Sequence, residues 1–130
     1  MPTGTALRVV DASALAALLF GEPEAERVVG ALSSGLLVAP ALLEFELANI
    51  CVTKARRDPS QRQFLWRALG LRDRMAIETV AVPMAEVVTL AEATGLTAYD
   101  ASYLWLARRL DAELVTLDRK LGEAVLRKNG

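Results

Sequence analysis

Short apolar runs alternate along this chain with longer segments in which apolar residues recur at helical spacing. The runs at Leu7–Val10, 36–38, 77–82 and 114–117 are rich in Val, Ile and Leu, which favours buried strands. Helical patterns occupy residues 13–20, 22–33, 40–57, 60–75, 84–94, 97–110 and the chain from 118 onwards. Strands that alternate with helices form a parallel sheet covered by helices on both faces, so we predict an α/β fold.

Local signals mark several of these boundaries. The long helix is predicted to begin at Pro40 and to end before Asp58-Pro59, because proline cannot continue a helix. Gly70 is expected to bend the next helix, and Gly95 follows a helix directly, where glycine commonly ends one.

The composition is typical of one domain spanning residues 1–130. Hydrophobic residues make up 53% of the chain, and the formal net charge of −1 gives no overall attraction to nucleic acid. Residues 1–5 lack the basic start of a signal peptide, and the longest uncharged run, residues 28–43, is too interrupted to span a bilayer. We therefore expect a protein without a membrane segment, located in the cytoplasm.

Two residue types limit the possible chemistry. The chain has no histidine, which removes the commonest general base and metal ligand. Its single cysteine, Cys51, excludes an intrachain disulfide and a thiolate metal cluster. Catalysis would therefore use carboxylates, hydroxyl groups, lysine, arginine or that cysteine.

Two aspartates stand where predicted strands end. Asp11 follows the first strand, and Asp118 follows the last strand, on the same face as Thr116. In open α/β sheets, ligands bind at the carboxyl ends of the strands. Each aspartate also has a simpler explanation, because Asp and Ser are favoured helix N-cap residues, and Asp11 or Ser13 would suffice to cap the first helix.

A helical wheel separates the two glutamates at the start of the helix over 40–57. The apolar face of this helix comprises Leu42, Leu43, Phe45, Leu47, Ile50 and Val52. Glu46 lies within that face, whereas Glu44 lies on the opposite side together with Cys51. A buried carboxylate must be paired or bound to a metal ion. The alternative is a small error in helix phase, with Glu46 reaching solvent.

Asp100 has a comparable position in the helix over 97–110. It lies on the apolar face above Tyr103, whereas Ser102 faces the other way. The alternative is a capping box, in which Thr97 caps the helix and the acidic residue three positions later completes the motif. Both interpretations place Asp100 at a helix start.

Asp11, Glu46, Asp100 and Asp118 can therefore converge on one rim of the fold. Carboxylates without a compensating cation repel one another, and a divalent ion would relieve that repulsion. A ligand set made only of oxygen atoms favours hard cations such as Mg²⁺ or Mn²⁺ over Zn²⁺.

Four stretches carry a resemblance to a known family. They are Val9-Val10-Asp11-Ala12-Ser13, Glu46-Leu47-Ala48-Asn49, Leu96-Thr97-Ala98-Tyr99-Asp100-Ala101 and Leu114-Val115-Thr116-Leu117-Asp118. In order and spacing they resemble the four acidic motifs of the PIN domain, and most of all those of the toxin ribonucleases of VapBC-type toxin–antitoxin pairs. The resemblance extends from Leu7 to about Leu121. Family members often have a last strand after the final helix, for which only residues 119–130 remain here.

The resemblance implies a PIN-like three-layer α/β/α sandwich with a central parallel sheet of four or five strands. It implies a metal-dependent endoribonuclease that acts as a toxin, with RNA as substrate, a cognate VapB-like antitoxin and a homodimeric assembly. The ligands of one or two Mg²⁺ or Mn²⁺ ions would be Asp11, Glu46, Asp100 and Asp118. Ser13 and Thr116 would orient these carboxylates, and ordinary capping or strand polarity is the alternative for both hydroxyl groups.

Basic residues gather in the segment 54–74, opposed only by Asp58 and Asp73. They are Lys54, Arg56, Arg57, Arg62, Arg67, Arg72 and Arg74. We interpret this segment as an RNA-binding strip, in which the candidate contacts are Lys54, Arg56, Arg57 and Arg62. A solvated helix face is the alternative.

Two other functions remain open at this stage. One is a PIN-like module that binds a partner without catalysis, against which the intact set of four acidic residues argues. The other is a different α/β phosphate-handling hydrolase, such as a phosphatase with an aspartyl nucleophile. That chemistry commonly uses a second Asp two positions after the first, where this chain has Ser13.

Overall fold

The first strand lies inside a parallel sheet, with a neighbour on each side. In the computed structural model, which describes residues 6–33 and 35–127, the strand order is β3-β2-β1-β4. Val9 of β1 is in register with Val38 of β2 and with Leu114 of β4. The side chains of Val9 and Val10 are completely buried, as expected for a strand covered on both faces.

The elements follow one another as the sequence pattern predicts. They are β1 (Leu7–Val10), α1 (Ala12–Leu19), α2 (Ala25–Leu32), β2 (Leu36–Pro40), α3 (Leu43–Arg57), η1 (Pro59–Gln61), α4 (Arg62–Gly70), η2 (Leu71–Arg74), β3 (Ile77–Val80), α5 (Met84–Thr94), α6 (Ala98–Leu110), β4 (Glu113–Val115) and α7 (Arg119–Leu126).

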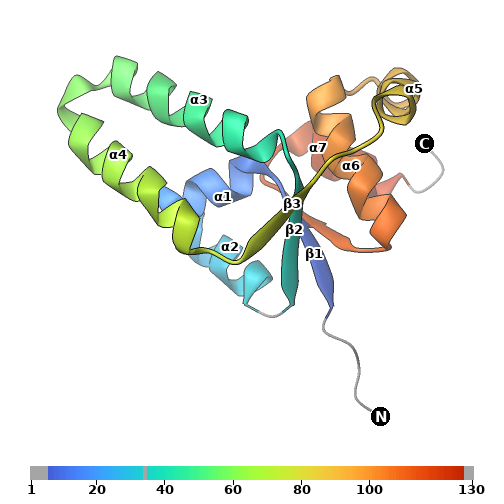
Figure 1. The fold of residues 1–130 in the computed structure, drawn as a ribbon, viewed down its shortest axis with the longest axis horizontal. Helices are drawn as coiled ribbons and strands as arrows, with labels where there is room; N and C mark the ends of the chain where they lie inside the picture. Colours follow the sequence, from blue (N-terminus) through green and yellow to red (C-terminus); the bar gives the residue numbers. More distant parts are fainter. Residues whose placement is uncertain (1–5, 34, 128–130) are drawn as a thin grey trace, which may run out of the picture.

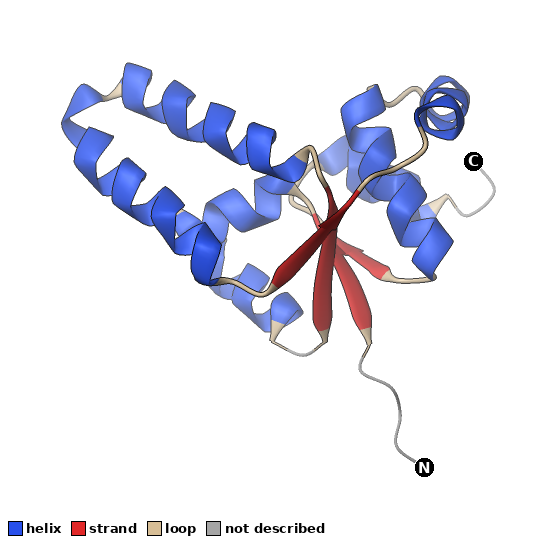
Figure 2. Ribbon diagram, viewed as in Figure 1, coloured by secondary structure: helices blue, strands red, loops and turns tan. Residues whose placement is uncertain are grey.

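Helices cover the sheet on both sides. Figure 1 shows α1 to α4 on one side of the strands and α5 to α7 on the other. The three-layer α/β/α arrangement predicted from the sequence is therefore confirmed, and the sheet has four strands in the described part of the chain (Figure 2). No strand follows α7 within residues 6–33 and 35–127. No helix of these residues has the length and apolar character needed to cross a membrane.

Several helix boundaries differ from the prediction, and two of these differences occur at a proline and a glycine. Pro40 ends β2 instead of starting a helix, and the backbone N–H of Ala41 still donates to the carbonyl of Val80, at 2.9 Å. The strand pairing thus continues past Pro40 and delays the start of α3 to Leu43. After Gly70 the chain continues as a short 3₁₀ helix, so the glycine ends α4 instead of bending it.

The buried face of α3 is narrower than the wheel predicts. It consists of Leu43, Leu47, Cys51 and Ala55, one residue from each successive turn. Phe45 is 79% exposed and Cys51 is 2% exposed, so their predicted sides are wrong. In Figure 1, α3 and α4 form an antiparallel pair that projects away from the sheet, which leaves much of α3 without a covering layer.

Candidate active site

Asp11 stands directly after β1 and is 3% exposed. It caps α1, because its Oδ1 atom accepts a hydrogen bond from the backbone N–H of Ala14 at 3.0 Å. The hydroxyl of Ser13 donates to the same oxygen at 2.7 Å, and the hydroxyl of Thr116 donates to Oδ2. Asp11 is therefore the N-cap of α1, and the hydroxyl groups of Ser13 and Thr116 also donate hydrogen bonds to its carboxylate.

The two hydroxyls join the ends of two neighbouring strands, β1 and β4. Ser13 on α1 accepts a hydrogen bond from the backbone N–H of Leu117 at 2.9 Å. Thr116 accepts one from the backbone N–H of Asp118, also at 2.9 Å. Asp118 in turn caps α7 by accepting from the N–H of Leu121 at 2.8 Å. The segments after β1 and β4 therefore hold each other in place.

Glu46 lies in the first turn of α3 and is partly buried. Its Oε1 atom accepts a hydrogen bond of 2.6 Å from the phenol of Tyr103 on α6. The helix phase separates it from Glu44, which is exposed and forms an ion pair of 2.7 Å with Arg72. The predicted difference between the two glutamates is thus present in the structure.

Asp100 lies in the first turn of α6 and is partly buried. Its backbone N–H donates to the hydroxyl of Thr97 at 3.1 Å, so the predicted Thr97 cap exists. Ser102 is buried and donates to the carbonyl of Ala98, so its predicted outward position is wrong. α6 packs against three strands of the sheet. Its buried face is therefore wider than the positions of its apolar residues indicate.

The four carboxylates influence one another electrostatically. Burial is the main cause that raises the pKa of Asp11, and the charge of Asp118 adds to it, whereas hydrogen bonds from Thr116, Ala14 and Ser13 oppose it. Burial also raises the pKa of Glu46, with smaller contributions from the charges of Asp100 and Asp11.

Asp100 follows the same pattern. Burial raises its pKa most, the charges of Asp118 and Asp11 raise it further, and the nearby cation Lys120 lowers it. The four acidic residues come from four different parts of the chain, and their charges raise the pKa values of Asp11, Glu46 and Asp100.

The spacing of these groups determines whether they can hold a metal ion as they stand. Among the described residues, no three carboxylate or thiol side chains are close enough together to hold an ion as they stand. The donor chemistry nevertheless fits a hard divalent cation, because all four groups offer oxygen atoms and carry negative charge when ionised. Binding would require these side chains to move closer together than they lie in this structure.

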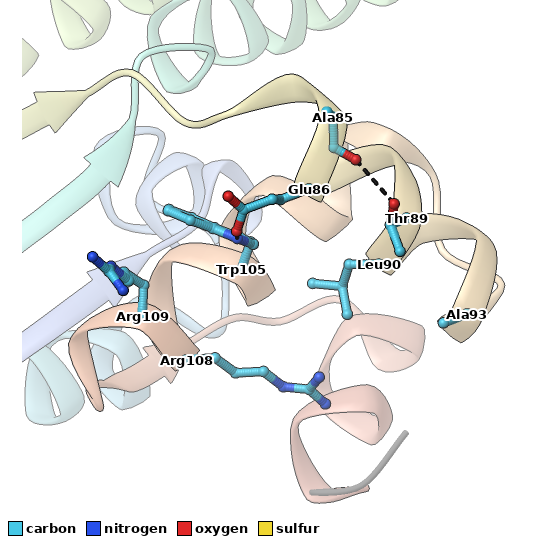
Figure 3. A pocket seen from close by; sticks show the side chains of 8 residues that line it. All are labelled: Ala85, Glu86, Thr89, Leu90, Ala93, Trp105, Arg108 and Arg109. Carbon is cyan, nitrogen blue, oxygen red and sulfur yellow. Dashed lines mark hydrogen bonds between the residues drawn. The ribbon is translucent and has the colours of Figure 1, made fainter.

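A separate hollow of about 640 Å³ lies between α5 and α6 and contains none of the four acids. Figure 3 shows the indole of Trp105 beside Glu86, to which it donates a hydrogen bond of 3.1 Å, with Arg108 and Arg109 along the same helix. Glu86 is the one carboxylate among its lining residues, so the hollow lacks the cluster of acidic groups that the predicted chemistry requires.

The basic segment divides into residues with different roles. Lys54 forms an ion pair of 2.6 Å with Glu22, and Arg72 is buried. Arg56 and Arg57 are exposed at the end of α3. The guanidinium of Arg62 lies 4.7 Å from the ring centre of Trp66, a side chain that is 46% exposed and so not in the core.

Two side-chain contacts of the neighbouring glutamates Glu46 and Glu44 were not predicted from the sequence. The first is the hydrogen bond from Tyr103 to Glu46, and the second is the ion pair of Arg72 with Glu44. Tyr103 stands three positions after Asp100, so the two share a helix face, and this spacing is the one signal the sequence offers.

Comparison with known proteins supports the resemblance on independent grounds. The family model of the PIN domain matches residues 8–125. The chain belongs to the PIN domain family. It is 33% identical over 120 residues to Ribonuclease VapC3 of Pyrobaculum aerophilum, covering 88% of this chain and 92% of that protein. It is 36% identical over 120 residues to Ribonuclease VapC9 of Mycobacterium tuberculosis, covering 88% of each chain.

Two solved protein structures have folds similar to the one described above. PAE2754 from Pyrobaculum aerophilum superposes with a TM-score of 0.71 at 27% identity, over 94% of both chains. Mycobacterium tuberculosis VapC20, described as a Sarcin-Ricin loop cleaving toxin, superposes with a TM-score of 0.65 at 16% identity, over 90% of this chain and 94% of that one. The predicted family and fold are therefore confirmed.

Proposed function

We propose that this PIN domain protein is a divalent-metal-dependent endoribonuclease and the toxin of a toxin–antitoxin pair. The observation that supports the proposal is the electrostatic interaction among Asp11, Glu46, Asp100 and Asp118. Burial and the charges of other members of this set raise the pKa values of three of them, Asp11, Glu46 and Asp100. Relatives of nearly the same length are ribonucleases of the VapC type, which gives this acidic site its proposed reaction.

The proposed chemistry assigns different tasks to the chain and to the ion. A bound divalent ion would activate a water molecule, polarise the scissile phosphate and stabilise the leaving oxygen. Asp11, Glu46, Asp100 and Asp118 would hold it, and their oxygen atoms favour Mg²⁺ or Mn²⁺. Ser13 and Thr116 keep both oxygens of Asp11 in fixed directions, so this carboxylate is oriented before any ion arrives.

Exposed basic side chains offer a path for the RNA backbone. We assign this role to Arg56, Arg57 and Arg62, which are exposed near the connection between α3 and α4. Lys54 is a weaker candidate, because its ammonium group is already paired with Glu22.

We further propose a VapB-like antitoxin as partner, a homodimer as assembly and the cytoplasm as location. Large apolar side chains that remain exposed on this chain, such as Phe45, Met84 and Val88, offer contact area for a protein partner. The four carboxylates would attract a basic side chain of an inhibitor. Light scattering at micromolar concentration and the product of a neighbouring gene test these two partners.

RNA cleavage by the purified protein tests the proposed activity. We expect cleavage with Mg²⁺ or Mn²⁺ and none in EDTA, with a phosphatase substrate left intact in parallel. RNA binding without cleavage in the presence of either metal would instead indicate a non-catalytic module. Hydrolysis of the phosphatase substrate alone would indicate a different phosphate-handling hydrolase.

A further inference from the structure

Tyr103 is a polar residue in the most buried part of α6. Its side chain is 1% exposed, and its phenol reaches Oε1 of Glu46 on α3 at 2.6 Å. A buried phenol needs a hydrogen-bond partner, and a carboxylate is the strongest acceptor that a protein offers. The contact joins α3 and α6 through two residues that are 57 positions apart in the sequence.

The other carboxylates of the site are fixed differently. Asp11 accepts hydrogen bonds from Ala14, Ser13 and Thr116, and Asp118 accepts one from Leu121. Glu46 has a longer side chain with more rotatable bonds, and within the described part of the chain the Tyr103 phenol is its one hydrogen-bond partner. Its second oxygen, Oε2, has none among these residues.

We propose that Tyr103 is a positioning residue that fixes Glu46 for metal binding, an inference that rests on the proposed function. A hydrogen bond to Oε1 restrains the rotamer of the glutamate and leaves Oε2 available as a ligand. Tyr103 is also one helical turn from Asp100, so α6 supplies one ligand directly and orients a second through its phenol. Outer partners of this kind typically change metal affinity or activity by about 10–100-fold.

Tyr103→Phe removes only the hydroxyl, and Tyr99→Phe is the matched control. Tyr99 is the other tyrosine of the chain, lies on the same helix and is 65% exposed. We expect Tyr103→Phe to raise the Kd for Mn²⁺, measured by calorimetry, by about 10-fold. We expect it to lower kcat with little change in KM for RNA, whereas Tyr99→Phe leaves the Kd unchanged. An unchanged Kd in a folded Tyr103→Phe variant would overturn the inference.

A double-mutant cycle separates positioning from a purely structural role. If Tyr103 acts through Glu46, adding Tyr103→Phe to Glu46→Gln should weaken Mn²⁺ binding no further. An additional loss equal to that of the single variant would contradict the inference. Wild-type protein that neither binds Mn²⁺ nor cleaves RNA would refute the proposed function itself, which is a distinguishable result.

A measurement on protein with an intact Tyr103 covers the case in which Tyr103→Phe does not fold. In the Tyr99→Phe variant, Tyr103 is the only tyrosine, and labelling at ring carbon Cζ gives it a single NMR resonance. Mg²⁺ should shift this resonance, because its hydrogen-bond acceptor changes environment. Binding of Mg²⁺ with no shift would show that Glu46 and Tyr103 do not respond together.

Discussion

Glu44 and Arg72 form an ion pair of 2.7 Å that ties the first turn of α3 to the chain before β3. Arg72 is 9% exposed and also donates to the carbonyls of Met75 and Ile77. Its Nε atom is buried and has no hydrogen-bond partner among residues 6–33 and 35–127. Glu44 therefore provides the compensating charge for a guanidinium group whose hydrogen-bond donors are not all paired within these residues. Glu44 therefore contributes to stability, two positions away from a proposed metal ligand.

This relationship predicts opposite effects for two neighbouring glutamates. Glu44→Gln should lower the free energy of unfolding by about 1 kcal/mol, a modest value because the side chain of Glu44 is 46% exposed. Cleavage of RNA by this variant should stay close to wild type. Glu46→Gln should abolish metal-dependent cleavage with little loss of stability. Urea unfolding and cleavage assays on both variants check this, and the reverse pattern would mean that Glu44 faces the site.

Asp11→Asn should keep the fold and lose the activity. Asparagine can still accept the hydrogen bond from Ala14 that caps α1, so the helix start is preserved. The loss of charge should lower kcat by more than about 100-fold, above the effect typical of residues that only orient a ligand. Circular dichroism and single-turnover cleavage measure the two effects. Wild-type cleavage by the folded variant would reduce Asp11 to a helix cap.

Thr116 should act through its hydroxyl rather than its shape. This hydroxyl donates to Asp11 and accepts from the N–H of Asp118, so it orients both strand ends. Thr116→Val should lower cleavage by about 10-fold, and Thr116→Ser should restore most of it. Equal activity in the valine and serine variants would exclude a role for the hydroxyl.

The basic strip should appear in the salt dependence of RNA binding. Replacing Arg56 and Arg57 with Gln should weaken binding and reduce the slope of log K against log salt by about 0.7 for each phosphate that the protein no longer neutralises. Arg27→Gln on α2 is the control, since it removes one positive charge from another helix, half of what the double variant removes. If the control changes the slope by half as much as the double variant or more, the effect is one of net charge alone.

Local patterns in the sequence were sufficient to predict the strands, the layer order and the positions of the acidic residues. Asp11 and Asp118 follow buried apolar runs. The end of such a run marks the carboxyl end of a strand, so these positions can be recognised in the sequence of a parallel-sheet protein. The phase of α3 was harder to predict, because the apolar Phe45 suggests a buried face that no neighbouring layer covers. The contacts of Tyr103 and Arg72 could not be predicted, because their partners lie 57 and 28 positions away.

The last prediction uses stability to test whether the acidic residues share one site. The pKa of Asp100 is raised mainly by burial and further by Asp118 and Asp11. A carboxyl group whose pKa is higher in the folded state than its ordinary value of 3.8 favours folding below that pH. The contribution is lost as pH rises through the folded-state pKa. Wild-type protein in EDTA should therefore lose stability as the pH rises above about 4.

Asp100→Asn removes the charge that causes this loss. The variant should melt close to wild type at acidic pH and higher than wild type at neutral pH in EDTA. The difference should be a few degrees if the relief is on the order of 1 kcal/mol. Mg²⁺ or Mn²⁺ should raise the melting temperature of wild type more than that of the variant, because a ligand stabilises the state that binds it. If Asp100 only completes a helix cap, the variant would be neutral or less stable in EDTA, and metal would shift both proteins equally.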